Sequence, residues 1–259
     1  MNIKHLLIIY YTILRKEATR VLRIWPQTIL PSAITVTLYF LIVGKVIGSR
    51  IGNMEGFEYM QFITPGLIIM AVINSSYFNV VGSFYGSKFN KSIEELLISP
   101  ANDHLIILGY ISGGIVRGVL VAVVVNLVAF FFGGFELHIY SAFLVMISIF
   151  MCCALFSLGG FINGILSQKF DDTTIFPNFI LVPLIYLGGI FYSLKILPPF
   201  WQKLAMYNPL FYIVDFVRYA YIGSSLVSPN IALTTIVILI FILYLVCWTL
   251  LSRGIRLKS

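Results

Sequence analysis

The sequence has few charged residues for its length. They make up 10% of the 259 residues, against about a quarter in an average soluble domain. Apolar residues make up 59%, and the mean hydropathy is +0.98. Such a surplus of apolar side chains is accommodated only where lipid surrounds the protein. The composition therefore excludes a soluble domain and predicts an all-α membrane protein with several spans, since helices satisfy their own backbone polar groups in lipid.

The motifs of common enzyme sites are also absent. The sequence contains no G-x-x-x-x-G-K-[ST] phosphate-binding loop, no H-E-x-x-H zinc motif and no G-x-S-x-G nucleophile motif. The three cysteines lie inside apolar runs, as small buried side chains do, and the three histidines are far apart. We therefore predict no catalytic residue, no metal site and no cofactor bound by this chain. Any work driven by ATP needs a separate ATPase.

Six stretches have the length and apolarity of membrane spans, since about 20 apolar residues cross a hydrocarbon core of roughly 30 Å. They lie at about residues 28–47, 62–83, 106–132, 139–166, 173–194 and 230–251. The fifth contains Pro177 and Pro183, which should bend it or leave backbone carbonyls free. The sequence thus predicts six transmembrane helices in a single domain that covers residues 1–259.

Residues 4–24 precede the first span and form an amphipathic pattern. At about 100° per residue, Arg15, Arg20 and Arg23 share one face, and apolar residues occupy the other. Glu17 is the one misfit on the apolar face. A basic face above an apolar face suits anionic lipid headgroups, so we expect an interface helix that lies along the membrane.

Lysine and arginine are distributed unequally between the two sides of the membrane. The side with both termini holds eleven: Lys4, Arg15, Lys16, Arg20, Arg23, Lys88, Lys91, Lys169, Arg253, Arg256 and Lys258. The other side holds five: Lys45, Arg50, Lys195, Lys203 and Arg218. The richer side is the cytoplasmic one, so both termini are predicted to be cytoplasmic. Because the net charge of +7 arises at span ends, we expect no nucleic-acid partner.

The cytoplasmic segment 88–100 has the pattern of a short helix. Its apolar residues Ile93, Leu96 and Leu97 fall on one side, and its charged residues fall elsewhere, namely Lys91, Glu94 and Glu95. Ser99-Pro100 should end the helix. Two interpretations stay open. The helix is a handle by which a partner moves the adjoining spans, or it is a solvated connector.

Polar residues occur inside two predicted spans. Asn74 and Asn79 in the second span need partners in lipid and should face other helices or a cavity. Arg117 lies within the third span, where an arginine costs about 2.5–3.5 kcal/mol on insertion scales. It could bind a partner on another helix, line a cavity, or extend to the interface if the span begins later.

The stretch 187–223 is rich in aromatic residues, with 10 in 37. Pro198-Pro199 interrupts it, a short helix is expected from Phe200 and Trp201 onward, and Asn208-Pro209 makes a turn before a second helix. In that second helix Asp215 and Arg218 are spaced i,i+3 and should pair. We predict a re-entrant helical hairpin at 198–223 on the outer side. The alternative is a plain aromatic belt that anchors two spans.

Three blocks carry a resemblance to a known family. They are MQFITPGLIIMAV at 60–72, KSIEELLISPANDHLIILGY at 91–110 and YLGGIFYSLKILPPFWQKLAMYNPLFYIVDFVRYAYIG at 186–223. In these blocks the chain resembles the membrane permease subunit of type-2 ABC exporters. It is most similar to bacterial inner-membrane permeases of the drug-resistance and nodulation-factor export group.

The resemblance implies a dimer, expected to be a homodimer, that works with two copies of a separate ATPase, which uses ATP and magnesium. It implies that residues 91–100 are the coupling helix and that the hairpin caps the exit of the path. It also implies that the second and fifth spans line the path, where the polar candidates are Asn74, Asn79, Asn178 and Tyr186. The expected function is export of an amphiphilic substrate. The alternatives are a stand-alone ion-driven carrier or lipid scramblase, or a membrane scaffold.

Overall fold

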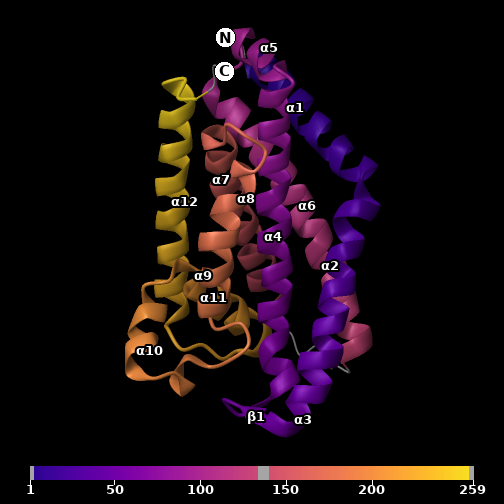
Figure 1. Cartoon of the computed structure of the whole chain (residues 1–259), viewed down its shortest axis with the longest axis vertical. Helices are drawn as coiled ribbons and strands as arrows, with labels where there is room; N and C mark the ends of the chain where they lie inside the picture. The colour runs from indigo at the N-terminus through magenta and orange to yellow at the C-terminus, as the bar shows by residue number, and fades with distance from the viewer. Residues whose placement is uncertain (1–2, 134–139, 257–259) are drawn as a thin grey trace.

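The computed structural model describes residues 3–133 and 140–256 as a bundle of long helices (Figure 1). The elements in order are α1 (Ile3–Arg23), α2 (Trp25–Tyr39), π-helix η1 (Phe40–Ile47), α3 (Gly48–Ile51), β1 (Asn53–Met54), β2 (Phe57–Glu58), α4 (Tyr59–Phe89), α5 (Ser92–Ile98), α6 (Asp103–Gly133), α7 (Ala142–Leu166), α8 (Asp172–Phe176), π-helix η2 (Pro177–Leu181), α9 (Val182–Leu187), 3-10 helix η3 (Leu194–Ile196), α10 (Pro199–Met206), α11 (Pro209–Ile222) and α12 (Pro229–Ser252).

Five helices are long and apolar enough to cross a membrane, namely Trp25–Ile51, Tyr59–Phe89, Asp103–Phe131, Ala142–Leu166 and Pro229–Ser252. Each of these helices overlaps one of the six expected spans, although the first residue expected in the fourth span, 139, lies outside the described residues. The remaining one is the shorter apolar helix Asp172–Leu187, made of α8, η2 and α9. It ends seven residues earlier than expected, because Gly189 (φ 75°) turns the chain. Its π-helical part begins at Pro177, where the missing N–H interrupts the α-helical ladder.

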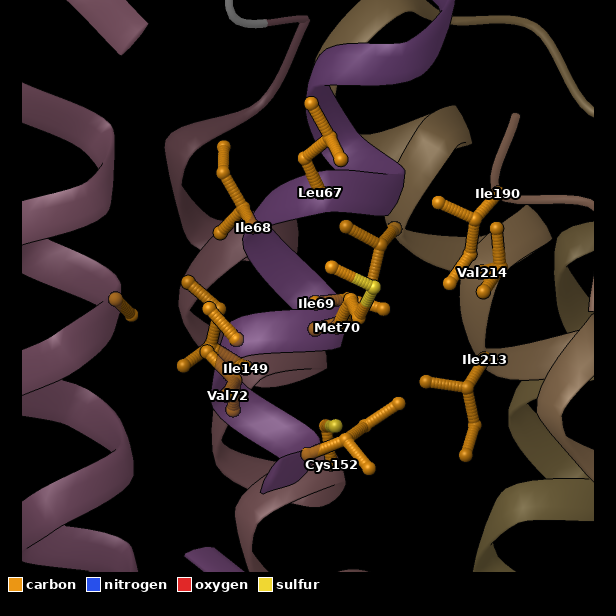
Figure 2. Packing of buried hydrophobic residues seen from close by; sticks show 14 of the residues in the cluster. Leu67, Ile68, Ile69, Met70, Val72, Ile149, Cys152, Ile190, Ile213 and Val214 are labelled. Carbon is orange, nitrogen blue, oxygen red and sulfur yellow. The ribbon is translucent and has the colours of Figure 1, made fainter. Parts of the chain in front are cut away.

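Helix α4 lies at the centre and packs against α6, α7 and α11. Apolar side chains of α4 fill the space between these neighbours, and Figure 2 shows Ile69 and Met70 between Ile149 of α7 and Ile213 of α11. Gly66 of α4 permits a close approach of the chain at Ile190. A Cβ there would meet the backbone carbonyl of Ile190 at 2.9 Å. Most side chains of α4 are buried, which explains why it shows no polar stripe of the kind found on a surface helix.

A small hairpin joins the first two spans. After the helical turn α3, strands β1 and β2 pair antiparallel, with Met54 opposite Phe57. Glu55 and Gly56 form the two-residue turn, and both have positive φ values of 54° and 87°. This is the geometry of a type I′ turn, which matches the twist of a hairpin.

The segment between α9 and α12 holds the two expected short helices, α10 and α11, at the end of the bundle opposite α5 (Figure 1). Both helices begin with a proline, Pro199 and Pro209, where the missing N–H costs nothing. Pro198 precedes α10 with extended backbone. Asn208 caps α11, because its Oδ1 accepts from the backbone N–H of Leu210 at 3.0 Å. The prediction of two helices broken at these prolines is confirmed.

Candidate functional site

The short helix α5 stands at the end of the bundle where α1 begins and α12 ends (Figure 1). It covers Ser92–Ile98, so the expected start at residue 88 was wrong, and Lys88 belongs to the last turn of α4. Lys91 has left-handed backbone (φ 59°), which reverses the chain between α4 and α5. Ser99 is extended and is followed by Pro100, which ends α5 as predicted.

Helix α5 has one buried anchor and a broad exposed surface. Ile93 is 1% exposed and packs in a cluster with Phe84 of α4 and Ile106 of α6, and Leu96 is partly buried beside it. Glu94, Glu95 and Lys91 are exposed, as expected. Leu97 was expected on the buried side but is exposed. Ile98 is 86% exposed, and Phe89 at the end of α4 is 75% exposed, so exposed apolar side chains lie on α5 and close to it in sequence.

Lys88 connects the chain just before α5 to the end of α7. Its Nζ donates hydrogen bonds to the carbonyls of Ile165 at 2.9 Å and Ser167 at 2.7 Å. The last carbonyls of a helix have no partner within that helix and carry partial negative charge, so an ammonium group is favourable there. Arg256 donates from Nη1 to the carbonyl of Leu166 at 2.9 Å. Sequence reasoning missed this site, because Lys88 is 79 residues from Ser167 and no local pattern links them.

Helix α1 is attached to α4 by hydrogen bonds from an ion pair within α1. Glu17 is fully buried and lies 3.0 Å from Nη2 of Arg20. Its carboxylate also accepts from Ser83 Oγ at 2.7 Å, and Arg20 donates to Asn79 Oδ1 at 2.9 Å. Gly113 of α6 makes room for this group, since a Cβ there would lie 2.7 Å from Cβ of Glu17. The misfit on the apolar face of residues 4–24 is thus a buried charge with its partners, which is the condition for burying one.

Arg117 lies one turn after Gly113 on α6 and is partly buried. Its Nε has no hydrogen-bond partner among the described residues. No carboxylate in the described ranges pairs with it. The buried carboxylate of Glu17 is bonded to Arg20 and Ser83. The structure therefore gives no support to an interhelix ion pair for Arg117.

Asp215 and Arg218 of α11 are both buried, but they do not form the predicted ion pair. The carboxylate of Asp215 accepts from the backbone N–H groups of Leu226 and Val227 at 3.0–3.1 Å. Arg218 instead donates from Nη2 to the carbonyl of Gly189 at 2.6 Å, and its guanidinium lies 3.9 Å from the ring centroid of Phe62. The sequence correctly indicated two buried charges on α11, but the predicted pairing between them was wrong. Each side chain instead hydrogen-bonds to backbone groups of a loop distant in sequence, which the i,i+3 spacing does not reveal.

The β1–β2 hairpin binds the segment before α10. Glu55 accepts from Lys195 Nζ and from Ser193 Oγ, each at 2.6 Å. The hydrogen bond from Lys195, followed by that from Ser193, holds the pKa of Glu55 below its ordinary value. Asn208 also ties α11 to α9, since its Nδ2 donates to the carbonyl of Leu184 at 2.7 Å. Phe200 and Trp201 of α10 are largely exposed.

The four polar candidates for a path lie in different surroundings. Asn74 is half-buried on α4, and its amide donates to the carbonyl of Met70 at 3.0 Å. Asn178 and Tyr186 are exposed on η2 and α9, and Tyr186 stacks on Phe191. Asn79 is fully buried and bonded to Arg20, so it does not share a surface with the other three.

Comparison with known proteins identifies the family. The profile of the ABC-2 type transporter family matches residues 9–222. The chain is 48% identical over 244 residues to the inner membrane transport permease YadH of Escherichia coli K12, covering 94% of each chain. It is 20% identical over 221 residues to nodulation protein J of Rhizobium leguminosarum bv. viciae, covering 83% of each. The chain therefore belongs to the ABC-2 type transporter family, as the multi-pass inner-membrane permease component rather than the ATPase.

Proposed function

We propose that this permease is one half of a homodimeric exporter, driven by two copies of an ABC ATPase that dock on α5, and that its substrate is amphiphilic. The observation that carries the proposal is that α5 has one buried side and exposed apolar residues on its other side. Ile93 anchors the helix to α4 and α6, while Leu97, Ile98 and Phe89 present an apolar surface outward. Solvent-exposed apolar residues grouped in this way indicate a docking site for a protein. Glu94 and Glu95 add acidic contacts around it.

Motion of α5 reaches the spans through three connections in this proposal. The chain itself continues from α4 into α5 and from α5 into α6. Lys88 binds the end of α7, next to the start of the helix Asp172–Leu187. The hydrogen bond from Ser83 Oγ to the carboxylate of Glu17 joins α1 to the same part of α4. Hence a force on α5 would move α1, α4 and α7 together.

The topology in this proposal has six spans, with Asp172–Leu187 as the fifth. Helix Asp172–Leu187 is short, and the turn at Gly188-Gly189 brings the chain back toward the bundle before α10. Helices α10 and α11 then form a re-entrant hairpin in the outer leaflet. The excess of lysine and arginine at the α5 end supports a cytoplasmic location of both termini. Exposed aromatic residues of α10 suit a depth where rings meet both lipid and headgroups.

A second copy of the chain would cover the open face of α4. This face carries Asn74, Phe78 and Gly82, spaced four residues apart and at least partly exposed. The neighbouring helix Asp172–Leu187 exposes Phe179, which is 77% exposed, and Tyr186. Two such faces opposed across a dimer axis would enclose a path lined by aromatic and amide groups. This lining supports an amphiphilic substrate, with Asn178 and Asn74 as its polar contacts.

Copurification with a coexpressed ABC ATPase from the same organism tests the docking surface. Ile98→Asp should reduce retention of the ATPase at least tenfold, because it places a charge in an apolar contact, and Glu94→Lys with Glu95→Lys should also weaken it. Ile51→Asp is the matched control, since Ile51 is exposed at the opposite end of the bundle. Retention that ignores all changes in 92–98 would refute docking on α5. Transport in vesicles without ATPase, driven by an ion gradient, would instead identify a carrier.

A further inference from the structure

A cavity lies between α7 and the helix Asp172–Leu187. It has a volume of about 430 Å³ and is lined by residues of α4, α7, the helix Asp172–Leu187, α11 and α12. Most of its wall is apolar, with Phe156, Phe176, Leu239 and Leu243 among the lining residues. Cavities that bind small ligands span about 300–1,000 Å³. This space is therefore large enough for a ligand, and its wall favours a hydrocarbon.

The cavity is elongated along α7. Its lining residues on that helix run from Leu155 to Leu166, which at 1.5 Å per residue is about 17 Å. One leaflet contributes half of a hydrocarbon core of roughly 30 Å, or about 15 Å. The length of the cavity thus fits one acyl chain of a lipid that lies parallel to the helices.

One end of the cavity leads into a pocket of about 360 Å³ that has charged side chains in its wall. The two spaces share Asn163, Leu166 and Phe176, and the second adds Ser167, Asp172 and Arg256. The carboxylate of Asp172 accepts from the backbone N–H groups of Gln168 and Lys169. Arg256 is exposed and donates from Nη1 to the carbonyl of Leu166, and its guanidinium group carries further N–H donors that a phosphate accepts. An apolar chamber beside this guanidinium group suits an anionic phospholipid.

Tyr77 supplies an independent observation at this chamber. It lines the cavity, is 1% exposed and stacks on Phe176 with 6.1 Å between ring centroids. Its hydroxyl lies near the side-chain amide of Asn163 but forms no hydrogen bond of ordinary length in the part of the chain that the structure describes. A buried hydroxyl without a full hydrogen bond is unfavourable. An ester carbonyl of a lipid would provide the acceptor.

We propose that this chamber binds one acyl chain of an anionic phospholipid from the leaflet on the α5 side. The phosphate lies near Arg256, the glycerol ester region lies near Tyr77 and Asn163, and the chain extends along α7 toward Pro209. The site faces α12 and is separate from the open face of α4. Lipid binding at this site therefore does not depend on the proposed export function.

A photoactivatable phosphatidylglycerol, with a diazirine in its acyl chain, tests the site. The full-length permease is reconstituted in vesicles without ATPase, irradiated, and analysed by peptide mass spectrometry. Label is expected on cavity-lining residues of α7 and α12. Leu239→Trp should fill the cavity and reduce that label at least fivefold. The adjacent Ile238→Trp, on the exposed face of α12, should leave it unchanged. Gel filtration verifies that both variants are folded.

The headgroup is tested with a diacylglycerol that carries the same diazirine chain but no phosphate. Wild-type protein and Arg253→Gln should both label more strongly with the phospholipid, and Arg256→Gln should lose that preference. Tyr77→Phe should weaken labelling by both probes. The proposal is overturned if label appears only on outward-facing residues, if Leu239→Trp labels like Ile238→Trp, or if wild-type protein does not prefer the phospholipid.

Discussion

The Nζ of Lys88 lies 2.7 Å from the backbone carbonyl oxygen of Ser167, so the last turn of α4 holds the residue that follows α7. The same ammonium group binds the carbonyl of Ile165. Lys88 stands four residues before α5, and Ser167 stands five residues before α8. This contact connects the proposed docking helix to the beginning of the helix Asp172–Leu187, without passing through the apolar core.

Replacing Lys88 with methionine should separate docking from transport. Methionine keeps the length of the side chain but removes two charge-assisted hydrogen bonds, which together contribute about 1.5–3 kcal/mol of stability. We expect normal retention of the ATPase, a lower melting temperature and a loss of ATP-dependent transport of at least fivefold. Lys91→Met is the control, because Lys91 is exposed. Equal behaviour of the two variants would contradict a connecting role for Lys88.

The buried carboxylate of Glu17 should matter more than any exposed acid of the chain. Glu17→Gln leaves Arg20 without its counter-charge, and Arg20 keeps partial exposure and Asn79 as a partner. We therefore expect a loss of about 1–3 kcal/mol in unfolding free energy. Thermal unfolding in detergent measures it, with the exposed Glu94→Gln as control.

A double-mutant cycle isolates the pair. Glu17→Gln with Arg20→Leu should cost less than the sum of the two single changes, because residues that share a contact are not additive. Additive losses would show that Glu17 and Arg20 act independently.

The Glu55 contact predicts a dependence of stability on pH. Lys195 and Ser193 lower the pKa of Glu55 in the folded protein from its ordinary value of 4.5. The contribution is therefore fully present above pH 4.5 and is lost as the pH falls through the lowered pKa. It should be below about 1 kcal/mol, because the group is near solvent. The melting temperatures of wild type and Glu55→Gln should differ at pH 7 and converge toward pH 3. A constant difference would contradict the ion pair.

Exchange of the two charges on α11 should fail to restore stability. Asp215 holds the N–H groups of Leu226 and Val227, and Arg218 holds the carbonyl of Gly189, so Asp215→Arg with Arg218→Asp places each charge against the wrong backbone group. The double variant should yield as little folded protein as either single variant. Asp215→Asn should be milder than Asp215→Leu, since its amide oxygen still accepts a hydrogen bond. Recovery in the exchanged variant, measured by fluorescence-detected gel filtration, would favour a direct ion pair.

Local features of the chain predicted much of the architecture. Spans, proline-initiated helices and α5 follow from hydropathy and from residues that start or stop helices, and these effects act over a few residues. The errors occurred where the outcome depended on a neighbour. Lys88 continues α4 instead of starting the short helix, and Leu97 is exposed because α5 buries only Ile93 and part of Leu96.

By itself, the sequence determined that the chain is a multi-pass helical membrane protein with no nucleotide-binding loop, because polarity and backbone hydrogen bonding in lipid leave no other solution. Tertiary structure alone decided which charges meet which partners. Glu17 and Ser83 are 66 residues apart, and Asp215 binds a loop instead of Arg218. A buried charge needs a polar partner. Which polar group lies close enough depends on how the helices pack, and that packing is a property of the whole bundle.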